Sequence, residues 1–327
     1  MSAAATAPVL GLHATGEDPQ TGEILVSGLR DAMLGLGRAD PRTADQLAAE
    51  LDRARSDYRT GAYTSCAVRL PRLLSTAHAL PAPDPALLSH TYLIATRILI
   101  KLDEQQLGWM AADRARQCAA TAGQPLVLAE TARQQAVLAR KAGWTDQALT
   151  LALDAGDDPA LHRHGHAGLA VRGLLIQSAA YTLAWTGDQA GMRELITEAA
   201  HLAQSAPLTS SRGLGLEDFT SATVQLHLIS AEYRAGDPAA AITAAEGVDT
   251  TRLTAERRAR LHTDRANAFI RWGRCADAID ALLAAERNAP QETHARPAVR
   301  SLISGLLLSR RVTPDLRRLA GRSGIAL

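Results

Sequence analysis

The chain has 327 residues, of which 46% are hydrophobic and 21% charged, a composition that supplies a large core and excludes a chain disordered as a whole. Only 3% of the residues are aromatic while alanine and leucine are abundant, which favours closely packed helix pairs over β-structure. The formal charge of +1 excludes a global attraction to nucleic acid or to an anionic membrane, so local patches must carry any such binding.

Residues 1–22 are rich in alanine, glycine and threonine, and we expect them to form a disordered tail. They contain no Lys or Arg and no sustained apolar stretch, so they do not predict a signal peptide. No run of about 18 uncharged apolar residues predicts a membrane span. The three cysteines, Cys66, Cys118 and Cys275, form no CxxC pair and indicate packing residues in a reduced, cytoplasmic protein.

Residues 23–327 are expected to form one helical repeat domain. Apolar residues at helical spacing predict a first helix over 23–36, and Asp40-Pro41 predicts the start of a second helix that runs to Arg59. After a proline-rich break at 80–85, the pattern predicts hairpins over 86–101 with 104–122, 125–142 with 145–155, 167–186 with 188–205, 216–235 with 238–246, and 253–272 with 275–288. Two last helices are expected near 297–310 and 314–322. Residues 205–215 are rich in Ser, Gly and Pro, which predicts a flexible surface excursion.

The turns within these hairpins share a glycine, which indicates a repeat. Gly61, Gly143, Gly187, Gly236 and Gly273 are 82, 44, 49 and 37 residues apart, and the first gap contains a glycine-less turn at 101–103. A period of about 34 to 47 residues is typical of stacked helical hairpins, which bury their cores against neighbouring hairpins.

Small residues recur where the two helices of a hairpin must approach closely. The clearest set is Ala266, Phe269, Gly273, Ala278, Leu282, Ala285 and Pro290. This spacing resembles the tetratricopeptide pattern, in which a small residue on the first helix faces an alanine on the second and a proline ends the unit. The sequence therefore predicts an all-α fold, a tetratricopeptide-like right-handed solenoid of about six hairpins with terminal capping helices.

Residues 29–34 (LRDAML), 109–115 (WMAADRA) and 296–300 (RPAVR) through 313–320 (TPDLRRLA) resemble, with the repeats between them, the sensor region of actinobacterial XRE-family transcriptional regulators. In that family a helix-turn-helix DNA-binding domain precedes a tetratricopeptide-like array that binds a peptide, a small ligand or a protein. The resemblance covers about residues 23–327, and the 22 residues before it are too few for a domain of that type. It therefore implies a stand-alone sensor or adaptor related to gene regulation, without direct DNA binding.

A histidine cluster, His162, His164 and His166, lies between two predicted hairpins. Neutral imidazoles bind Zn or Ni, but only Asp157 and Asp158 lie near enough in sequence to complete a tetrahedral set. We expect a solvated loop here, and neither a metal nor another cofactor.

The C-terminal basic run comprises Arg310, Arg311, Arg317, Arg318 and Arg322. Arginines pair with phosphate, and residues 313–325 look like a fragment of a helix-turn-helix. However, a lone helix lacks the scaffold for groove docking, and a solenoid needs a terminal helix with a polar outer face. We expect a capping helix, and a DNA-binding regulator that uses atypical basic helices is the alternative.

The sequence contains no Gly-x-Ser-x-Gly elbow, no HExxH motif and no Walker-type phosphate loop. We therefore expect a protein that is not an enzyme. An enzyme with an unrecognised site on a helical scaffold is the second alternative.

In tetratricopeptide hairpins the first helix of each pair lines the concave face. Aligning the turns at one phase places polar and aromatic side chains there, namely Tyr58, Arg97, Arg133, Arg140, Gln177, Tyr181, Trp185, Tyr233, Arg234, Asn267 and Arg271. Arginine forks bind carboxylates, and Asn or Gln can clamp a peptide backbone. This groove is expected to bind a peptide, a small acidic ligand or a protein partner, and no membrane. Binding would shift the packing between hairpins and so alter a partner or homodimer surface.

Overall fold

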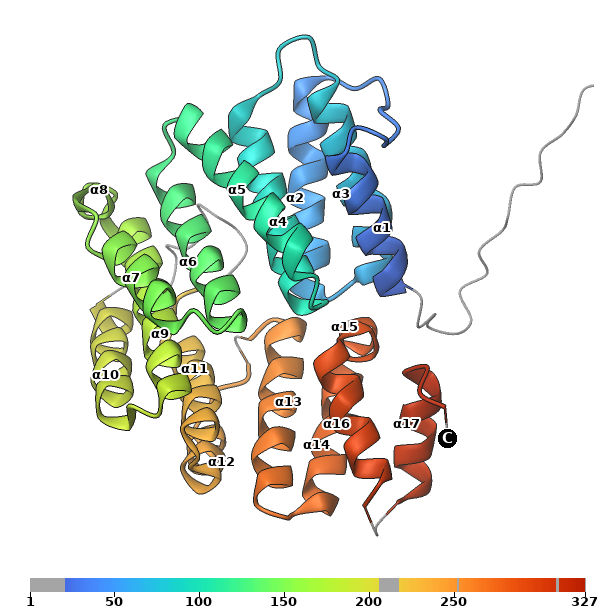
Figure 1. Cartoon of the computed structure of the whole chain (residues 1–327), viewed down its shortest axis with the longest axis vertical. Coiled ribbons are helices and arrows are strands. Elements are labelled where there is room, and N and C mark those ends of the chain that lie inside the picture. Colours follow the sequence, from blue (N-terminus) through green and yellow to red (C-terminus); the bar gives the residue numbers. More distant parts are fainter. Residues whose placement is uncertain (1–20, 206–217, 252, 310–311, 327) are drawn as a thin grey trace, which may run out of the picture.

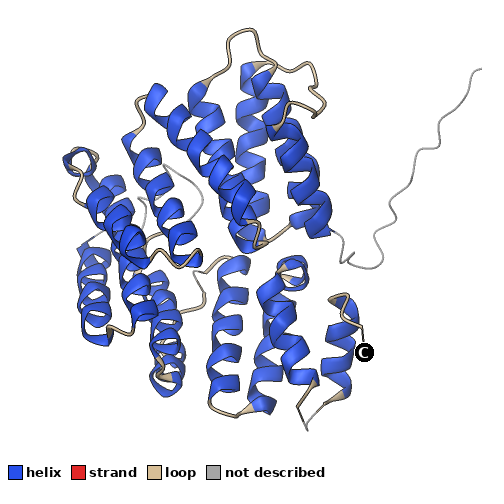
Figure 2. Ribbon diagram, in the orientation of Figure 1, coloured by secondary structure: helices blue, strands red, loops and turns tan. Residues whose placement is uncertain are grey.

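A computed structural model describes residues 21–205, 218–251, 253–309 and 312–326, and within these ranges it consists of helices and loops without a strand (Figure 1, Figure 2). The predicted all-α class is confirmed for this part of the chain. Most of the expected disordered tail, and nearly all of the expected excursion at 205–215, lie outside the described residues.

Helices follow one another in chain order. The first three are α1 (Thr21–Met33), α2 (Ala44–Thr60) and α3 (Tyr63–His78). Five hairpins of packed neighbours then run α4 (Pro85–Lys101) with α5 (Gln105–Thr121), α6 (Pro125–Lys141) with α7 (Thr145–Gly156), α9 (Gly165–Thr186) with α10 (Gln189–Ser205), α11 (Ser221–Ala235) with α12 (Pro238–Glu246), and α13 (Ala255–Arg271) with α14 (Cys275–Asn288). The remaining helices are α8 (Pro159–His162), α15 (Pro290–Ala295), α16 (Pro297–Leu307) and α17 (Pro314–Arg322).

The predicted start of the second helix was wrong, because a capping box decides it. Helix α2 begins at Ala44, not at Asp40-Pro41. The Thr43 side chain accepts a hydrogen bond from the Gln46 backbone N–H at 3.3 Å, and the Gln46 side chain accepts one from the Thr43 N–H at 3.0 Å. These two bonds satisfy N–H groups that have no partner within the helix, so they fix its first turn.

The predicted start at 216 was also too early, since residues 218–220 are not helical and α11 begins at Ser221 after a second capping box between Thr220 and Thr223. The helices α8 and α15 were not predicted. Both are short and begin at a proline, Pro159 and Pro290, which the sequence pattern suggests only as a break. No bounds were predicted for α3, and the remaining helices begin and end within about three residues of the expected positions.

The glycine turns are where the sequence predicts them. The turn at 101–103 has no glycine, and there Asp103 adopts a left-handed backbone with φ of 64°. Aspartate is one of the few residue types that tolerate this conformation, because its short side chain can make local hydrogen bonds. Gly143 and Gly187 take the same conformation in their turns, with φ of 84° and 83°. The repeat unit that was expected between Gly61 and Gly143, with a turn that lacks glycine, is therefore present as α4 and α5.

Small residues form the contacts within hairpins. Ala266 of α13 and Ala278, Leu282 and Ala285 of α14 are fully buried, as their spacing predicts. Alanine side chains let two helix backbones approach closely while still burying apolar surface. The paired helical arrangement is thus established, whereas the assignment to a right-handed tetratricopeptide-like solenoid stays a prediction.

The two ends of the array meet. Helix α2 contacts α13 and α3 contacts α15, and Figure 1 shows α13 to α17 beneath α1 to α5, with α6 to α12 joining them at one side. Arg59 at the end of α2 binds Asp218 through two hydrogen bonds of 3.0 and 3.4 Å. The Thr64 backbone N–H donates to the Gln291 side chain of α15 at 3.0 Å. The array therefore curls back on itself, so that its two ends lie side by side.

The C-terminal helix α17 covers the end of the array. Leu316, Leu319 and Ala320 are fully buried against α16 and its neighbours, while Arg317 and Arg318 are exposed on the opposite face. This amphipathic pattern is what a capping helix requires.

Truncating the buried face of α17 should therefore destabilise the fold. We expect Leu319→Ala to lower the free energy of unfolding by about 2–4 kcal/mol, the usual loss for a leucine cavity in a core. Chemical denaturation measures this change. Arg317→Gln on the exposed face serves as the control and should leave stability within about 0.5 kcal/mol of the original. Equal effects of the two changes would contradict the capping role.

Candidate functional site

A cavity of about 250 Å³ lies on the inner face where the two ends of the array meet. It receives side chains from α2, α4, α6, α9, α11, α13 and the start of α16. Its lining comprises Tyr58, Arg97, Ile100, Lys101, Arg133, Gln134, Val137, Arg140, Ser178, Tyr181, His227, Ser230, Glu256, Arg257, Arg260, Asp264 and Arg296. Seven of these described residues are basic and two are acidic, so the lining carries a net positive charge, part of which is neutralised by Glu130 and Glu292 beside it. Five belong to the predicted groove: Tyr58, Arg97, Arg133, Arg140 and Tyr181.

One wall is an arginine pair that shares a carboxylate. Glu130 of α6 is 1% exposed, and its Oε1 accepts from Arg97 Nη1 at 2.8 Å. Arg133 binds both oxygens of the same carboxylate at 2.8 and 2.7 Å. Arg97 Nε also donates to the Tyr58 hydroxyl at 3.2 Å, which ties α4 to α2. These charge-assisted bonds hold both guanidinium groups beside the cavity.

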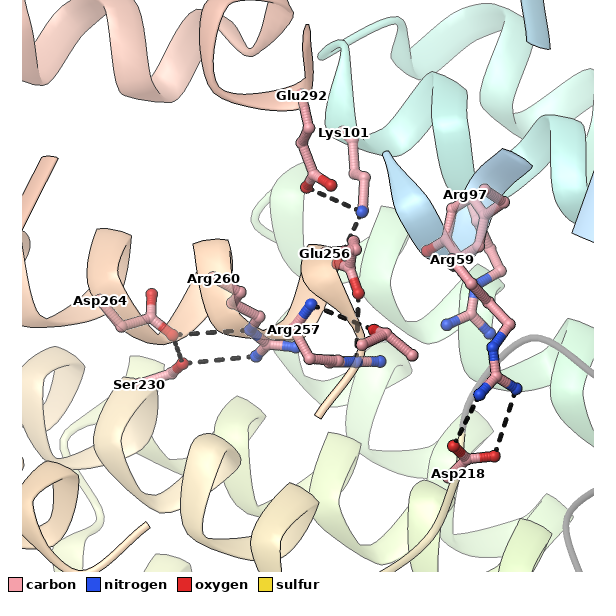
Figure 3. Close-up of polar contacts among 12 residues, drawn as sticks. Arg59, Arg97, Lys101, Asp218, Ser230, Glu256, Arg257, Arg260, Asp264 and Glu292 are labelled. Atoms are coloured by element: carbon pink, nitrogen blue, oxygen red, sulfur yellow. Dashed lines mark hydrogen bonds and ion pairs between the residues drawn. The ribbon is translucent and has the colours of Figure 1, made fainter. Parts of the chain in front are cut away.

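The opposite wall joins the two ends of the chain through Lys101. Its ammonium at the end of α4 contacts Glu256 of α13 at 2.7 Å and Glu292 of α15 at 2.9 Å (Figure 3). Burial alone would lower the pKa of Lys101, but the two carboxylates outweigh burial and raise it above its usual range. The ammonium therefore stays charged while it is buried.

The pKa values of the two carboxylates that contact Lys101 shift in opposite directions. Burial would raise the pKa of Glu256, but Lys101 and the neighbouring Arg257 outweigh burial and lower the pKa to about 2. Burial raises the pKa of Glu292 and Lys101 does not fully offset it. The Glu292 Oε2 atom is buried and accepts no hydrogen bond from a described residue, which explains why its ionised form is less well stabilised.

The helix α13 brings two more arginines to the cavity. Arg257 Nε lies 3.3 Å from Glu256, and Arg260 Nε lies 3.5 Å from Asp264, one turn further along the helix. Arg260 Nη2 also donates to the Ser230 hydroxyl of α11 at 3.3 Å, as Figure 3 shows. These contacts hold Arg257 along α13 and fix the Arg260 guanidinium against α11.

Arg140 of α6 is the buried cation that lacks a carboxylate. It is 5% exposed, and its Nη1 donates to the Ser178 backbone oxygen at 3.3 Å and to the Thr182 hydroxyl at 3.0 Å. Its guanidinium stacks on the Tyr181 ring at 4.7 Å, but no acidic side chain among the described residues pairs with it. Burial lowers the pKa of Arg140 to about 10, and nearby cations, Arg133 first among them, add to this effect.

Arginine–aromatic contacts join the first helices of neighbouring hairpins. They are Arg97 over Tyr58 at 5.2 Å, Arg140 over Tyr181 at 4.7 Å, Arg234 over Trp185 at 3.4 Å and Arg271 over Tyr233 at 5.9 Å from the ring centroid. Such cation–π contacts are attractive because the ring face is electron-rich. The structure thus pairs eight of the predicted groove residues in one series that runs from α2 to α13.

Not all predicted groove residues reach the cavity. Trp185, Arg234, Tyr233 and Arg271 lie at the ends of their helices outside its lining. Asn267 donates to the Thr263 backbone oxygen at 3.1 Å within α13. Gln177 also lies outside the lining and is fully buried, and its amide has no hydrogen-bond partner among the described residues. The cavity therefore holds only part of the expected binding set.

Several lining residues that the sequence did not predict lie on the same face of α13 as the predicted groove residues. Arg257, Arg260 and Asp264 precede the predicted Asn267 and Arg271 at spacings of three and four residues, which is one face of a helix. Extending the phase alignment about three turns towards the start of α13 would have found them. Glu292, by contrast, lies in the unpredicted α15.

Three larger hollows lie elsewhere in the described structure, and one of them, of about 410 Å³, lies where the end of α2 meets the start of α13. Another, of about 380 Å³ between α2 and α3, contains Arg42 and Arg69, which pair with Glu50, and the exposed Arg72. The third, of about 660 Å³ beside α1, contains Arg114, whose Nη1 donates to the Met33 backbone oxygen at 2.6 Å. Apart from Arg72, these arginines are bound by the protein itself.

Other candidate chemistry lies apart from the cavity. His162 ends α8, and His164 Nδ1 lies 2.8 Å from the Ala160 backbone oxygen. The described residues contain no group of three metal-ligating side chains. Within the same ranges every helix is too short or too polar to cross a membrane.

No protein-family model and no curated protein sequence matches the chain.

Removing the Lys101 ammonium should destabilise the fold strongly. We expect Lys101→Met to lower the free energy of unfolding by about 3–5 kcal/mol, because it removes the ammonium that both buried carboxylates share and leaves them only the longer contacts with Arg257 and Arg296 at 3.3 and 3.5 Å. Lys141→Met is a matched control, since Lys141 ends α6 as Lys101 ends α4 but pairs with the exposed Asp103. Its loss should be at most about 1 kcal/mol. Equal losses would show that the cluster does not join the two ends.

Acid should weaken the same cluster. The folded chain keeps Glu256 ionised down to a pH of about 2, whereas in the unfolded chain its pKa returns to about 4.5. This contribution to stability is present above pH 4.5 and is lost as the pH falls towards 2. Unfolding free energies measured across this range should fall more steeply in the original protein than in Lys101→Met. Equal pH dependence of the unfolding free energy in the two proteins would contradict the pairing of Lys101 with Glu256.

Proposed function

We propose that the protein is a non-catalytic, cytoplasmic helical-repeat sensor or adaptor that binds a small acidic molecule in the central cavity. The observation that carries this proposal is the cationic lining, in which Arg140 is buried without a carboxylate partner. A buried charge is costly unless it is paired, so an anionic ligand would supply what the described residues leave out.

The size of the cavity favours a small ligand over an extended peptide. Its volume of about 250 Å³ is below the range of about 300–1,000 Å³ that is usual for drug-sized ligands. The contacts of α2 with α13 and of α3 with α15 close the face that an open solenoid would offer to a peptide. Among the expected partners, a small acidic ligand fits this geometry best.

The tetratricopeptide-like solenoid and the resemblance to regulator sensor regions belong to the same proposal. The first helices of the hairpins supply most of the cavity lining, and small residues lie between paired helices. Both features agree with repeats whose inner face binds a ligand. A protein partner or a second copy of the chain would recognise the ligand-bound form.

Ligand binding could change the shape of the array, because the two walls of the cavity come from distant parts of the chain. Arg97 and Arg133 belong to the first half of the array, whereas Arg257 and Arg260 belong to α13 near its end. A ligand that touches both walls binds the closed arrangement better than an open one. It would therefore shift the population towards closure and change the outer surface that a partner meets.

Arg310 and Arg311 of the C-terminal basic run lie outside the described residues, and two of the three arginines of α17 are paired with carboxylates. Arg318 pairs with Asp315 on the same helix, and Arg322 binds Glu286 of α14 at 2.6 and 2.7 Å. Both contacts suit a capping helix, and the buried face of α17 is needed by the array.

Native mass spectrometry of the full chain after exposure to a metabolite extract tests the proposal. We expect bound anionic species of small mass, and we expect Arg260→Gln in the cavity to reduce their occupancy by about tenfold, the usual effect of losing a charge-assisted hydrogen bond. Arg318→Gln on the outside is the matched control and should bind as the original does.

Two results would overturn the proposal. One is equal occupancy in Arg260→Gln and Arg318→Gln, which would place binding elsewhere. The other is retardation of DNA in a gel at physiological salt that Arg317→Ala with Arg318→Ala abolishes, which would establish the DNA-binding alternative.

A further inference from the structure

The two hydrogen-bond acceptors of Arg140 do not depend on it for a hydrogen bond. The Ser178 backbone oxygen that it binds also accepts from the Thr182 hydroxyl at 2.9 Å. The Thr182 hydroxyl, in turn, keeps that bond if Arg140 is removed. Because both partners stay satisfied, deleting the guanidinium would leave neither of them without a hydrogen bond.

The Arg140 guanidinium still has donors to spare. Its contacts with the protein use Nη1, while Nε and Nη2 donate to no described residue. Arg140 lines the cavity, so these donors are available to a ligand there. A planar guanidinium with two free donors suits an oxoanion, which accepts two parallel hydrogen bonds.

A second unused polar group lines the same cavity. Ser178 of α9 is 3% exposed, and its Oγ is buried without a hydrogen-bond partner among the described residues. The backbone oxygen of this residue contacts Arg140 Nη1, so the two groups lie on adjoining helices, α6 and α9. A buried hydroxyl is normally paired, and an unpaired one beside a cavity points to a ligand atom.

The surrounding charges favour an anion at this position. Arg133, Arg260 and Arg234 are each close enough to disfavour the charged form of Arg140. Folding brings these like charges together, although separation would be more favourable. An anion between them reverses the sign of the interaction, because each cation then attracts the ligand.

We infer that Arg140 and Ser178 are the anchor for a carboxylate or phosphate group of a compact ligand in the central cavity. This inference rests on the proposed function and adds the position and the chemical class of the bound group. The guanidinium donates through Nε and Nη2, and the serine hydroxyl, which the protein covers in this structure, donates through Oγ after rotation about its Cα–Cβ bond. Tyr181 holds the guanidinium plane by stacking at 4.7 Å.

Isothermal titration calorimetry of the full chain with inorganic phosphate and with succinate, at constant ionic strength, tests the anchor. We expect at least one of the two anions to bind. Arg140→Met and Ser178→Ala should each weaken that binding by about tenfold or more, the loss that follows from one charge-assisted hydrogen bond. Binding of phosphate alone would identify a phosphate-bearing ligand, and binding of succinate alone a carboxylate-bearing one.

Thermal unfolding without added anion separates an anchor from a structural residue. Arg140→Met should unfold at the same temperature as the original protein or at a higher one, because it removes an unpaired buried charge and keeps the packing of the side-chain stem. Residues held for binding often reduce stability in this way. A lower unfolding temperature, or unchanged affinity in both variants, would overturn the inference. Ser178→Ala keeps the test valid if Arg140→Met fails to fold.

Failure of this inference is distinguishable from failure of the proposed function. If neither anion binds the original protein, or if neither anchor variant weakens binding, the anchor is wrong. The small acidic ligand nevertheless stands if native mass spectrometry still detects species that depend on Arg260. If those species are also absent, both proposals are wrong.

Discussion

Lys101 ends α4, yet the carboxylates that surround its ammonium belong to α13 and α15, which follow it in the chain by more than 150 residues. A buried cation is tolerated when it is paired and bonded, and only a strongly curved array can supply these partners. The curvature that brings Glu256 and Glu292 to Lys101 also brings α2 to α13 and α3 to α15. The Lys101 cluster, together with the Arg59–Asp218 and Thr64–Gln291 contacts, therefore holds the two walls of the cavity together.

Closure changes what the inner face offers. An open solenoid presents a long groove, but here the inner arginines surround a volume of about 250 Å³. Arg97 and Arg133 share the carboxylate of Glu130, whereas Arg140 is buried with no acidic side chain beside it in the described structure. We attribute this difference to function, since two arginines retained for structure have a carboxylate partner and the third does not. A ligand that pairs with Arg140 would add to the forces that hold the two ends together.

The sequence predicted the hairpins because their signals are local. The glycine turns and the buried alanines of α13 and α14 depend on neighbouring residues, and the same phase alignment placed Arg133, Arg140 and Tyr181 beside one cavity. The start of α2 was missed because a capping box between Thr43 and Gln46 competes with the proline signal. The Lys101 cluster could not be predicted, since its partners are brought together by the curvature of the array, and a local repeat pattern does not specify that curvature.

Soaking a crystal of the protein with selenate would show whether curvature of the array creates an anion site at Arg140 and Ser178, because selenate is a tetrahedral oxoanion with a strong anomalous signal. We predict an anomalous peak within hydrogen-bond distance of the Arg140 guanidinium and the Ser178 hydroxyl, with Lys101 still bound to Glu256 and Glu292. An Arg140 side chain paired with an acidic residue of the protein, or a cavity without selenate while selenate binds elsewhere, would contradict the account.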